Sequence, residues 1–146
     1  MTSDSAVKVE ITSFSYKDPL PEHLFSWNEN RHGGGFVFDC RSLPNPGREE
    51  KFKLATGCDA AVRGYLENVP EVSLFREQAF GLVENAVKNF IERKFSYISV
   101  GFGCTGGQHR SVYFAETLTK YLHDRFGESV SIVIHHPSLV KKGLLK

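Results

Sequence analysis

The sequence is poor in cysteine: its three thiols are Cys40, Cys58 and Cys104, and no two of them stand in a C-x-x-C pair. An odd number of cysteines without paired spacing argues against a disulfide framework and against a zinc finger. Reduced thiols are typical of the cytoplasm. We therefore expect a cytoplasmic protein, and the sequence predicts neither a metal nor any other cofactor.

Long apolar runs and an excess of charge of one sign are also missing. No stretch approaches the roughly 18 apolar residues that a membrane-spanning helix needs, and the N-terminal MTSDSAVKVE lacks the apolar region of a signal peptide. Lysine and arginine number 18 against 17 acidic residues, which leaves a formal net charge of +1. This balance argues against a protein that coats nucleic acid, and we expect no membrane partner.

The length of 146 residues and the hydrophobic spacing predict one α/β domain over residues 1–146, with its core at about 7–139. Prolines and glycines place loops at 17–35 and 42–51. The order strand, strand, helix, helix, strand, helix, strand implies a β-α-β crossover, so we expect a small mixed sheet with flanking helices. Strands are predicted over 7–16, 36–41, 97–103 and 129–136, and helices over 60–67, 71–93 and 111–126.

Three finer predictions concern how these elements begin and pack. Residues 56–59 resemble a capping box in front of the first helix. Helical spacing puts Leu74 and Leu82 on the apolar side of the long helix. Gly101 and Gly103 leave one face of the third strand nearly bare, with room for a helix or a ligand.

The turn GFGCTGGQHRS joins the third predicted strand to the last predicted helix and contains no acidic residue. Gly106 and Gly107 allow successive N–H groups to point at one place, and the helix that follows adds its own unpaired N–H groups. Arg110 can offer a bidentate fork, and Thr105 and Ser111 add hydroxyl groups. These donors favour a bound phosphate over a purely structural turn.

Two nucleotide-binding patterns overlap with this turn and fit it poorly. Gly101, Gly103 and Gly106 spell G-x-G-x-x-G, but the next strand ends in two histidines, where a dinucleotide site needs an acidic residue. A Walker loop would need a lysine where Gln108 stands.

A chemical alternative is a cysteine-dependent phosphatase, because Cys104 and Arg110 form C-x5-R followed by a serine. In such enzymes a thiolate lies under a cradled phosphate, and a helix N-terminus with a nearby cation lowers the thiol pKa. Gly103 replaces the histidine that usually precedes the cysteine. Asp39 and Asp59 are the remaining candidates for the general acid, and neither is evident on a mobile loop.

A longer and more specific match lies in GCTGGQHRSVYFAE. Together with FVFDCRSLPNPG, TGCDAAVRGYLE and SFSYKDPLP, it resembles the C-terminal domain of the RapZ family of bacterial RNase adapter proteins, from about residue 11 to about residue 139. The resemblance implies recognition of glucosamine-6-phosphate, a part in RNA binding, and self-association into a homo-oligomer. Full-length members carry an N-terminal P-loop domain, so it also implies a sensing module that stands alone or belongs to a larger multidomain protein.

The resemblance also suggests which residues bind the ligand. Two positions depart from the family pattern: Gly47 stands where a histidine helps to bind the sugar phosphate, and Gln108 stands where a lysine is frequent. The predicted ligand-binding residues are Cys104, Thr105, Gly106, Gly107, Gln108, His109, Arg110 and Ser111, with Asp39, Arg41 and Asn45 from the second shared motif.

From the sequence we expect a regulatory domain that binds a phosphorylated metabolite rather than an enzyme. Arg110 and the helix N–H groups would hold the phosphate, and His109 would contact the sugar or a second charge. Asp39 and Arg41 would recognise sugar hydroxyls or the amine. The alternatives are a phosphatase that uses Cys104 and Arg110, and an RNA-binding or protein-adapter module in which the turn is structural.

Overall fold

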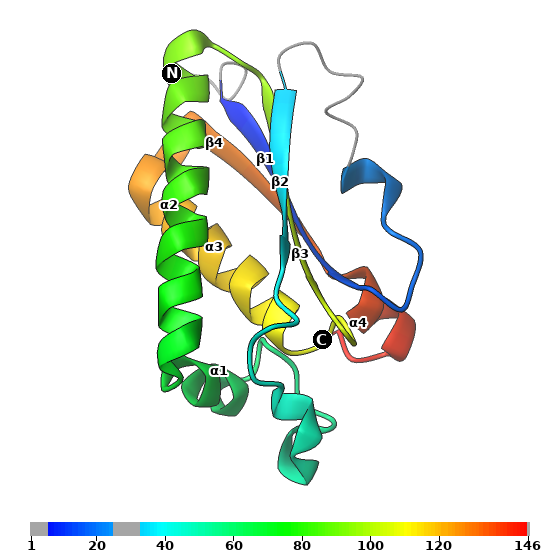
Figure 1. The fold of residues 1–146 in the computed structure, drawn as a ribbon. Coiled ribbons are helices and arrows are strands. Elements are labelled where there is room, and N and C mark those ends of the chain that lie inside the picture. Colours follow the sequence, from blue (N-terminus) through cyan, green and yellow to red (C-terminus); the bar gives the residue numbers. More distant parts are fainter. Residues whose placement is uncertain (1–5, 25–32, 146) are drawn as a thin grey trace.

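The computed structural model describes residues 6–24 and 33–145, which form a four-stranded sheet. Helices cover the faces of this sheet (Figure 1). The strands are β1 (Val7–Ser15), β2 (Gly33–Asp39), β3 (Tyr97–Cys104) and β4 (Val130–His135). The helices are α1 (Ala60–Glu67), α2 (Pro70–Arg93), α3 (Arg110–Phe126) and α4 (Pro137–Lys142). Short 3-10 helices lie at Pro46–Arg48, Glu50–Phe52 and Gly127–Ser129.

The sheet has the order β2-β3-β1-β4, and every neighbouring pair is parallel. The predicted α/β fold is therefore confirmed, but the sheet is parallel throughout where a mixed sheet was expected. Parallel neighbours need crossover connections, and α1 with α2 supplies one between β2 and β3. As a result, the carboxyl ends of all four strands lie at one edge of the sheet.

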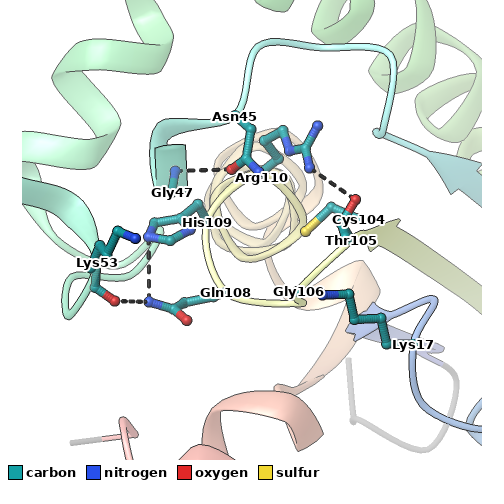
Figure 2. A pocket seen from close by; sticks show the side chains of 10 residues that line it. All are labelled: Lys17, Asn45, Gly47, Lys53, Cys104, Thr105, Gly106, Gln108, His109 and Arg110. Atoms are coloured by element: carbon teal, nitrogen blue, oxygen red, sulfur yellow. Dashed lines mark hydrogen bonds between the residues drawn. The ribbon is translucent and has the colours of Figure 1, made fainter. Parts of the chain in front are cut away.

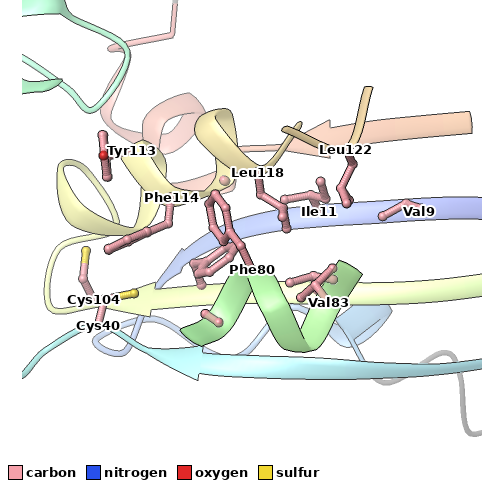
Figure 3. Packing of buried hydrophobic residues seen from close by; sticks show 14 of the residues in the cluster. Val9, Ile11, Cys40, Phe80, Val83, Cys104, Tyr113, Phe114, Leu118 and Leu122 are labelled. Atoms are coloured by element: carbon pink, nitrogen blue, oxygen red, sulfur yellow. The ribbon is translucent and has the colours of Figure 1, made fainter. Parts of the chain in front are cut away.

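The main core lies between one face of the sheet and helices α2 and α3 (Figure 3). Phe102 on β3 stacks on Phe38 of β2 and on Phe114 of α3, with ring centroids 5.4 and 5.7 Å apart. Fully buried aliphatic side chains fill the rest of this layer: Val9, Ile11, Ile98, Val100, Val83, Val87, Leu118 and Leu122. Burial of such side chains contributes about 1.5–3 kcal/mol each, so this layer holds α2 and α3 against the sheet.

The second face of β3 is covered by the chain itself. A Cβ atom at residue 101 would lie 2.8 Å from the Leu24 side chain, and one at residue 103 would lie 2.5 Å from Tyr16 and 2.6 Å from Phe14. The space that the glycines leave is thus filled by side chains of β1 and of the segment that follows it. This packing fixes the segment after β1 against β3.

The long helix begins one residue before the predicted start and buries a narrower stripe than expected. Val72, Phe80, Val83 and Val87 are buried, whereas Leu74 and Leu82 are each 55% exposed. The prediction for the two leucines was wrong because α2 rests on the sheet along one row of side chains, and these two lie beside that row. The other two helices, 60–67 and 111–126, agree with α1 and α3 to within one residue.

Two predicted turns differ in part from the structure. Gly33–Gly35 belong to β2, while residues 25–32 of the same predicted loop lie outside the described residues. Of the two bonds of the predicted capping box, one forms: the Asp59 carboxylate accepts from the Thr56 N–H at 2.7 Å. The Thr56 hydroxyl accepts from the Cys58 N–H at 3.1 Å instead of from the Asp59 N–H. These bonds close the turn before α1, and the Asp59 side chain caps none of the helix's own N–H groups.

Candidate functional site

A pocket of about 210 Å³ opens at the carboxyl edge of the sheet, where β3 turns into α3 (Figure 2). Ligands of open α/β sheets bind at this edge, because the loops after neighbouring strands meet there. Seven of the predicted residues line the pocket: Asn45, Cys104, Thr105, Gly106, Gln108, His109 and Arg110. Arg41 lines an adjacent hollow, and Asp39, Gly107 and Ser111 line neither.

The turn after β3 wraps around the sulfur of Cys104. The thiol is 2% exposed, and its Sγ lies 3.1 Å from the hydroxyl oxygen of Ser111. Burial raises the pKa of the Cys104 thiol, but the side-chain and backbone hydrogen bonds of Ser111, the charge of Arg110 and the N–H of Gly107 together lower that pKa below its ordinary value. Two of the N–H groups that the sequence assigned to a phosphate thus point at a sulfur.

Gly107 allows the turn to close against β1 and α4. Its φ of +63° lies in the left-handed region, and a Cβ atom there would come within 2.5 Å of the Ser138 hydroxyl oxygen and 2.9 Å of the Ser15 backbone nitrogen. On the other side of the turn, the Ser15 hydroxyl donates to the carbonyl of Thr105 at 2.6 Å. The turn is therefore held in one shape before any ligand arrives.

Arg110 is 3% exposed and holds the chain after β2 in place. Its Nη1 donates to the backbone carbonyls of Leu43 at 2.8 Å and Arg41 at 3.1 Å, while Nη2 lies 3.4 Å from the Thr105 hydroxyl. Its Nε–H is buried and has no partner among the described residues. Nε and Nη2 share one edge of the guanidinium, so this edge is the part of Arg110 that could receive a ligand oxygen.

Gln108 and His109 attach the turn to the segment after the second 3-10 helix. The Gln108 side-chain amide donates to the carbonyls of Lys53 and Ala55, each at 2.8 Å. His109 Nε2 donates to the Phe52 carbonyl at 2.7 Å, which leaves Nδ1 as an acceptor beside residue 47. Burial, the largest influence, lowers the pKa of His109, so the imidazole is neutral at pH 7.

Asn45 and Gly47 form the wall opposite the turn. The Asn45 side chain accepts from the Gly47 N–H at 2.9 Å and so caps the short helix Pro46–Arg48. A Cβ atom at residue 47 would lie 3.1 Å from both the Asn45 carbonyl oxygen and the His109 ring. The glycine at this position therefore keeps the mouth of the pocket open.

Asp39 and Arg41 bind each other at the rim. Three Arg41–Asp39 side-chain bonds of 2.6–3.0 Å join them, and Arg41 lies 3.9 Å above the ring of Tyr16. The hydrogen bonds from Arg41 lower the pKa of Asp39, so its carboxylate is ionised at neutral pH. Arg41 faces an adjacent hollow of about 520 Å³, which shares Asn45, Thr105 and Arg110 with the pocket.

Comparison with known proteins decides the assignment. The chain matches the RapZ C-terminal domain over residues 7–139. It belongs to this family. Relatives named "Nucleotide-binding protein" include one from Halorhodospira halophila, 36% identical over 124 residues, which are 82% of this chain and 38% of the relative. Another, from Acidithiobacillus ferrooxidans, is 36% identical over 135 residues, which are 92% of this chain and 41% of the relative.

This RapZ-type chain thus spans about 40% of the length of the relatives that it matches. A third relative, from Azoarcus, is 41% identical over 106 residues, which are 73% of this chain. None of the helices in the described part of the chain has the length and apolar character needed to cross a membrane.

Sequence reasoning missed three lysines at the pocket of this RapZ-type domain. Lys17 and Lys53 line the pocket, and Lys142 donates from α4 to the Gly106 carbonyl at 2.7 Å and to Gln108 Oε1 at 3.1 Å. The position of Lys17 just after β1 was a usable signal, because it puts the residue at the ligand-binding edge. Lys53 and Lys142 carry no such signal, since only the fold brings them to the turn.

Proposed function

We propose that this domain binds a phosphorylated metabolite in the pocket at the β3–α3 turn, and that the ligand is an amino-sugar phosphate such as glucosamine-6-phosphate. The observation that carries the proposal is the charge of the pocket. Lys17, Lys53 and Arg110 line it, and none of its lining residues is acidic. The unpartnered Nε–H of Arg110 supports the proposal, because a phosphate oxygen would satisfy a buried donor.

The adjacent hollow supports an amino sugar as the rest of the ligand. It continues from the pocket through Asn45, Thr105 and Arg110. Unlike the pocket, it has acidic residues in its lining, Glu49 and Glu71, together with Arg41 and Arg48. A ligand with an anionic end and a cationic end would place the phosphate by the lysines and the ammonium group toward these acids. The neutral His109, with an accepting Nδ1, suits a sugar hydroxyl between them.

Calorimetry with glucosamine-6-phosphate, glucose-6-phosphate and glucosamine tests this function. We expect glucosamine-6-phosphate to bind most tightly and glucosamine most weakly, because most of the charged contacts are to the phosphate. Equal affinities for glucosamine-6-phosphate and glucosamine would show that the site does not recognise a phosphate. Equal affinities for the two sugar phosphates would refute the part assigned to the amine.

The exposed lysines allow a test that leaves the fold intact. Lys17→Ala and Lys53→Ala should each weaken binding of glucosamine-6-phosphate by roughly fivefold, since an exposed charge pair contributes up to about 1 kcal/mol. The control is Lys120→Ala, because Lys120 is an exposed lysine of α3 that pairs with Asp124 at 3.0 Å and lines neither the pocket nor the adjacent hollow. A loss of affinity in the control as large as in the two pocket variants would place the phosphate elsewhere.

Two observations favour the phosphatase alternative, and others argue against it. The Ser111 contact and the lowered pKa of Cys104 are what a nucleophilic thiol needs. However, Nη1 of Arg110 is bonded to backbone carbonyls, Asp39 is paired with Arg41, and no carboxylate lines the pocket. Without an acid for the leaving group, phosphoryl transfer is slower by roughly 10²–10⁴-fold.

We accordingly expect Cys104→Ser to leave binding of glucosamine-6-phosphate nearly unchanged, and we expect no turnover in the unmodified protein. The assay follows release of p-nitrophenol from p-nitrophenyl phosphate, and of phosphate from sugar phosphates, between pH 5 and pH 8. Turnover that disappears in Cys104→Ser, together with a trapped phosphocysteine, would establish the phosphatase instead.

The remaining expectations from the family are part of the same proposal. They are RNA binding, self-association and a cytoplasmic location, for the 1–146 domain either alone or within a longer protein. The relatives named "Nucleotide-binding protein" are more than twice as long as this chain, so we assign no nucleotide site to it. The lysine-rich edge formed by Lys17, Lys53 and Lys142 is where an RNA phosphate would compete with the sugar phosphate.

A further inference from the structure

A second group of side chains meets outside the pocket. Cys58 lies just before α1, Glu116 lies in α3, and His136 lies between β4 and α4. One ligand atom from each, sulfur, oxygen and nitrogen, falls within 4.8 Å of the other two. These residues are far apart in the sequence, which is why cysteine spacing gave no sign of them. None of them lines the pocket proposed for the phosphate.

We propose that Cys58, Glu116 and His136 form a binding site for one Zn²⁺ ion. Thiolate, imidazole and carboxylate are the three protein ligands of zinc, and a set of three leaves the fourth position for water. A thiolate and a carboxylate together carry two negative charges, which balance a dication. Tetrahedral zinc ligands lie roughly 3.5 Å apart, so the three side chains need to move by only about 1 Å.

The histidine is oriented for this role by a partner behind it. His136 is 7% exposed; its Nδ1 lies 2.6 Å from the hydroxyl oxygen of Ser13, which is fully buried, and its Nε2 lies 2.7 Å from Glu116 Oε2. Nε2 therefore points into the group, and a ring nitrogen held from behind is the usual arrangement of a zinc-binding histidine.

The Ser13 hydroxyl can serve the site both with and without the ion. In the metal-free arrangement Nε2–H donates to the Glu116 carboxylate, and the Ser13 hydroxyl donates to Nδ1. On zinc binding, Nε2 presents its lone pair to the metal, the proton resides on Nδ1, and the hydroxyl accepts from it. The thiol proton of Cys58 goes to solvent, as metal binding to a thiol requires.

The surroundings allow an ion to enter. Cys58 is exposed, and the Glu116 side chain is 40% exposed, while the His136 side chain is 5% exposed. The backbone of Cys58 is fixed, because its carbonyl accepts from Arg63 Nη1 at 2.6 Å and its N–H donates to the Thr56 hydroxyl. The site is therefore anchored at its base and open on the side where water would complete the coordination.

Cobalt substitution tests the proposal directly, because a thiolate bound to Co²⁺ gives a charge-transfer band in the near ultraviolet. We expect one equivalent of Co²⁺ to produce this band in the 146-residue protein, and one equivalent of Zn²⁺ to abolish it. Cys58→Ser should remove the band, and His136→Gln and Ser13→Ala should each weaken binding by about tenfold or more. Absence of the band in the unmodified protein would refute the site.

Two matched controls separate this site from other ligands. Cys104→Ser removes a different thiol, and His135→Gln removes the neighbouring histidine, which pairs with Glu10 instead. Both variants should keep the band and the affinity. A band that survives Cys58→Ser but is lost in Cys104→Ser would place the metal in the phosphate pocket and overturn the proposal.

A measurement on the unmodified protein covers the case in which a variant at buried His136 does not fold. Cys58 is exposed while Cys40 and Cys104 are buried, so iodoacetamide should label Cys58 alone in the folded domain. Zn²⁺ should suppress this labelling, as read by mass spectrometry, and Mg²⁺ should not. Labelling of Cys58 at the same rate with and without Zn²⁺ would refute the site.

Discussion

Replacing Arg110 with methionine is expected to lower the free energy of unfolding by about 3–5 kcal/mol. Nη1 of Arg110 is the donor that satisfies the carbonyls of Arg41 and Leu43, at 3.1 and 2.8 Å. Methionine fills similar space and donates nothing, so those carbonyls lose their partner. A buried acceptor without a partner costs about 1–3 kcal/mol.

Arg110→Lys separates the structural part of this side chain from its part in binding. A lysine keeps the charge but cannot reach two carbonyls and a ligand oxygen at once. We expect a loss of stability smaller than for methionine, together with a loss of binding energy for glucosamine-6-phosphate of about 1.5–3 kcal/mol. Unchanged affinity in an Arg110→Lys protein that still folds would show that Arg110 does not contact the ligand.

The control for both variants is Arg41→Met, measured by urea unfolding at pH 7. Arg41 is also an arginine beside the pocket, but its side chain is 48% exposed, and Asp39 is its ion-pair partner. Exposed pairs contribute up to about 1 kcal/mol, so this change should be small. If Arg110→Met were as mild as Arg41→Met, the carbonyl contacts of Arg110 would not stabilise the loop after β2.

Gly57→Ala is the second substitution with a large expected effect, a loss of about 3 kcal/mol in stability. A Cβ atom on residue 57 would lie 2.3 Å from the Tyr113 nitrogen and 2.5 Å from the His109 carbonyl oxygen. Both are backbone atoms of α3 or its cap, so no side-chain rotation relieves the contact. The Gly57 N–H also donates to the Gln108 carbonyl at 2.9 Å, and the methyl group would lengthen that bond.

Gly64→Ala is the matched control for Gly57→Ala. Gly64 lies inside α1, and a Cβ atom there has nothing within 4 Å. Alanine should stabilise the helix by about 0.5–1 kcal/mol. We therefore expect Gly57→Ala to lower the midpoint of urea unfolding and Gly64→Ala to raise it. A Gly57→Ala protein as stable as the unmodified one would show that the contact between residues 56–58 and α3 is loose.

The lysine variants at the pocket differ from the Arg110 and Gly57 variants in the quantity that they should change. The side chains of Lys17 and Lys53 are exposed, and the bond from Gln108 to residue 53 uses its backbone carbonyl, which alanine keeps. The loss of these side chains should therefore appear in affinity alone. Arg110 and Gly57 act on stability first. A thermal unfolding measurement beside each titration is therefore needed to assign a lost affinity to the ligand contact rather than to a displaced loop.

The hydrophobic pattern predicted the strands and helices well, because buried side chains recur along the sequence with the period of the element that they belong to. The strands and long helices came within a few residues of the structure, with the exception of the start of β2, where three glycines look like a loop. Glycine has no side chain that reveals a strand, and only pairing with β3 makes Gly33–Gly35 one. The exposed Leu74 and Leu82 were misjudged for a related reason, since periodicity gives a face of α2 but not its width.

The sequence alone determined the α/β class, the position of the glycine turn between β3 and α3, and the family, because these depend on local pattern and on motif order. Tertiary structure decided what each group of the turn does. The N–H groups of Gly107 and Ser111 point at the Cys104 sulfur, and Arg110 holds the carbonyls after β2. Contacts between loops that follow different strands have no local signature. The lysines at the pocket and the meeting of Cys58 with His136 therefore became visible only in the folded chain.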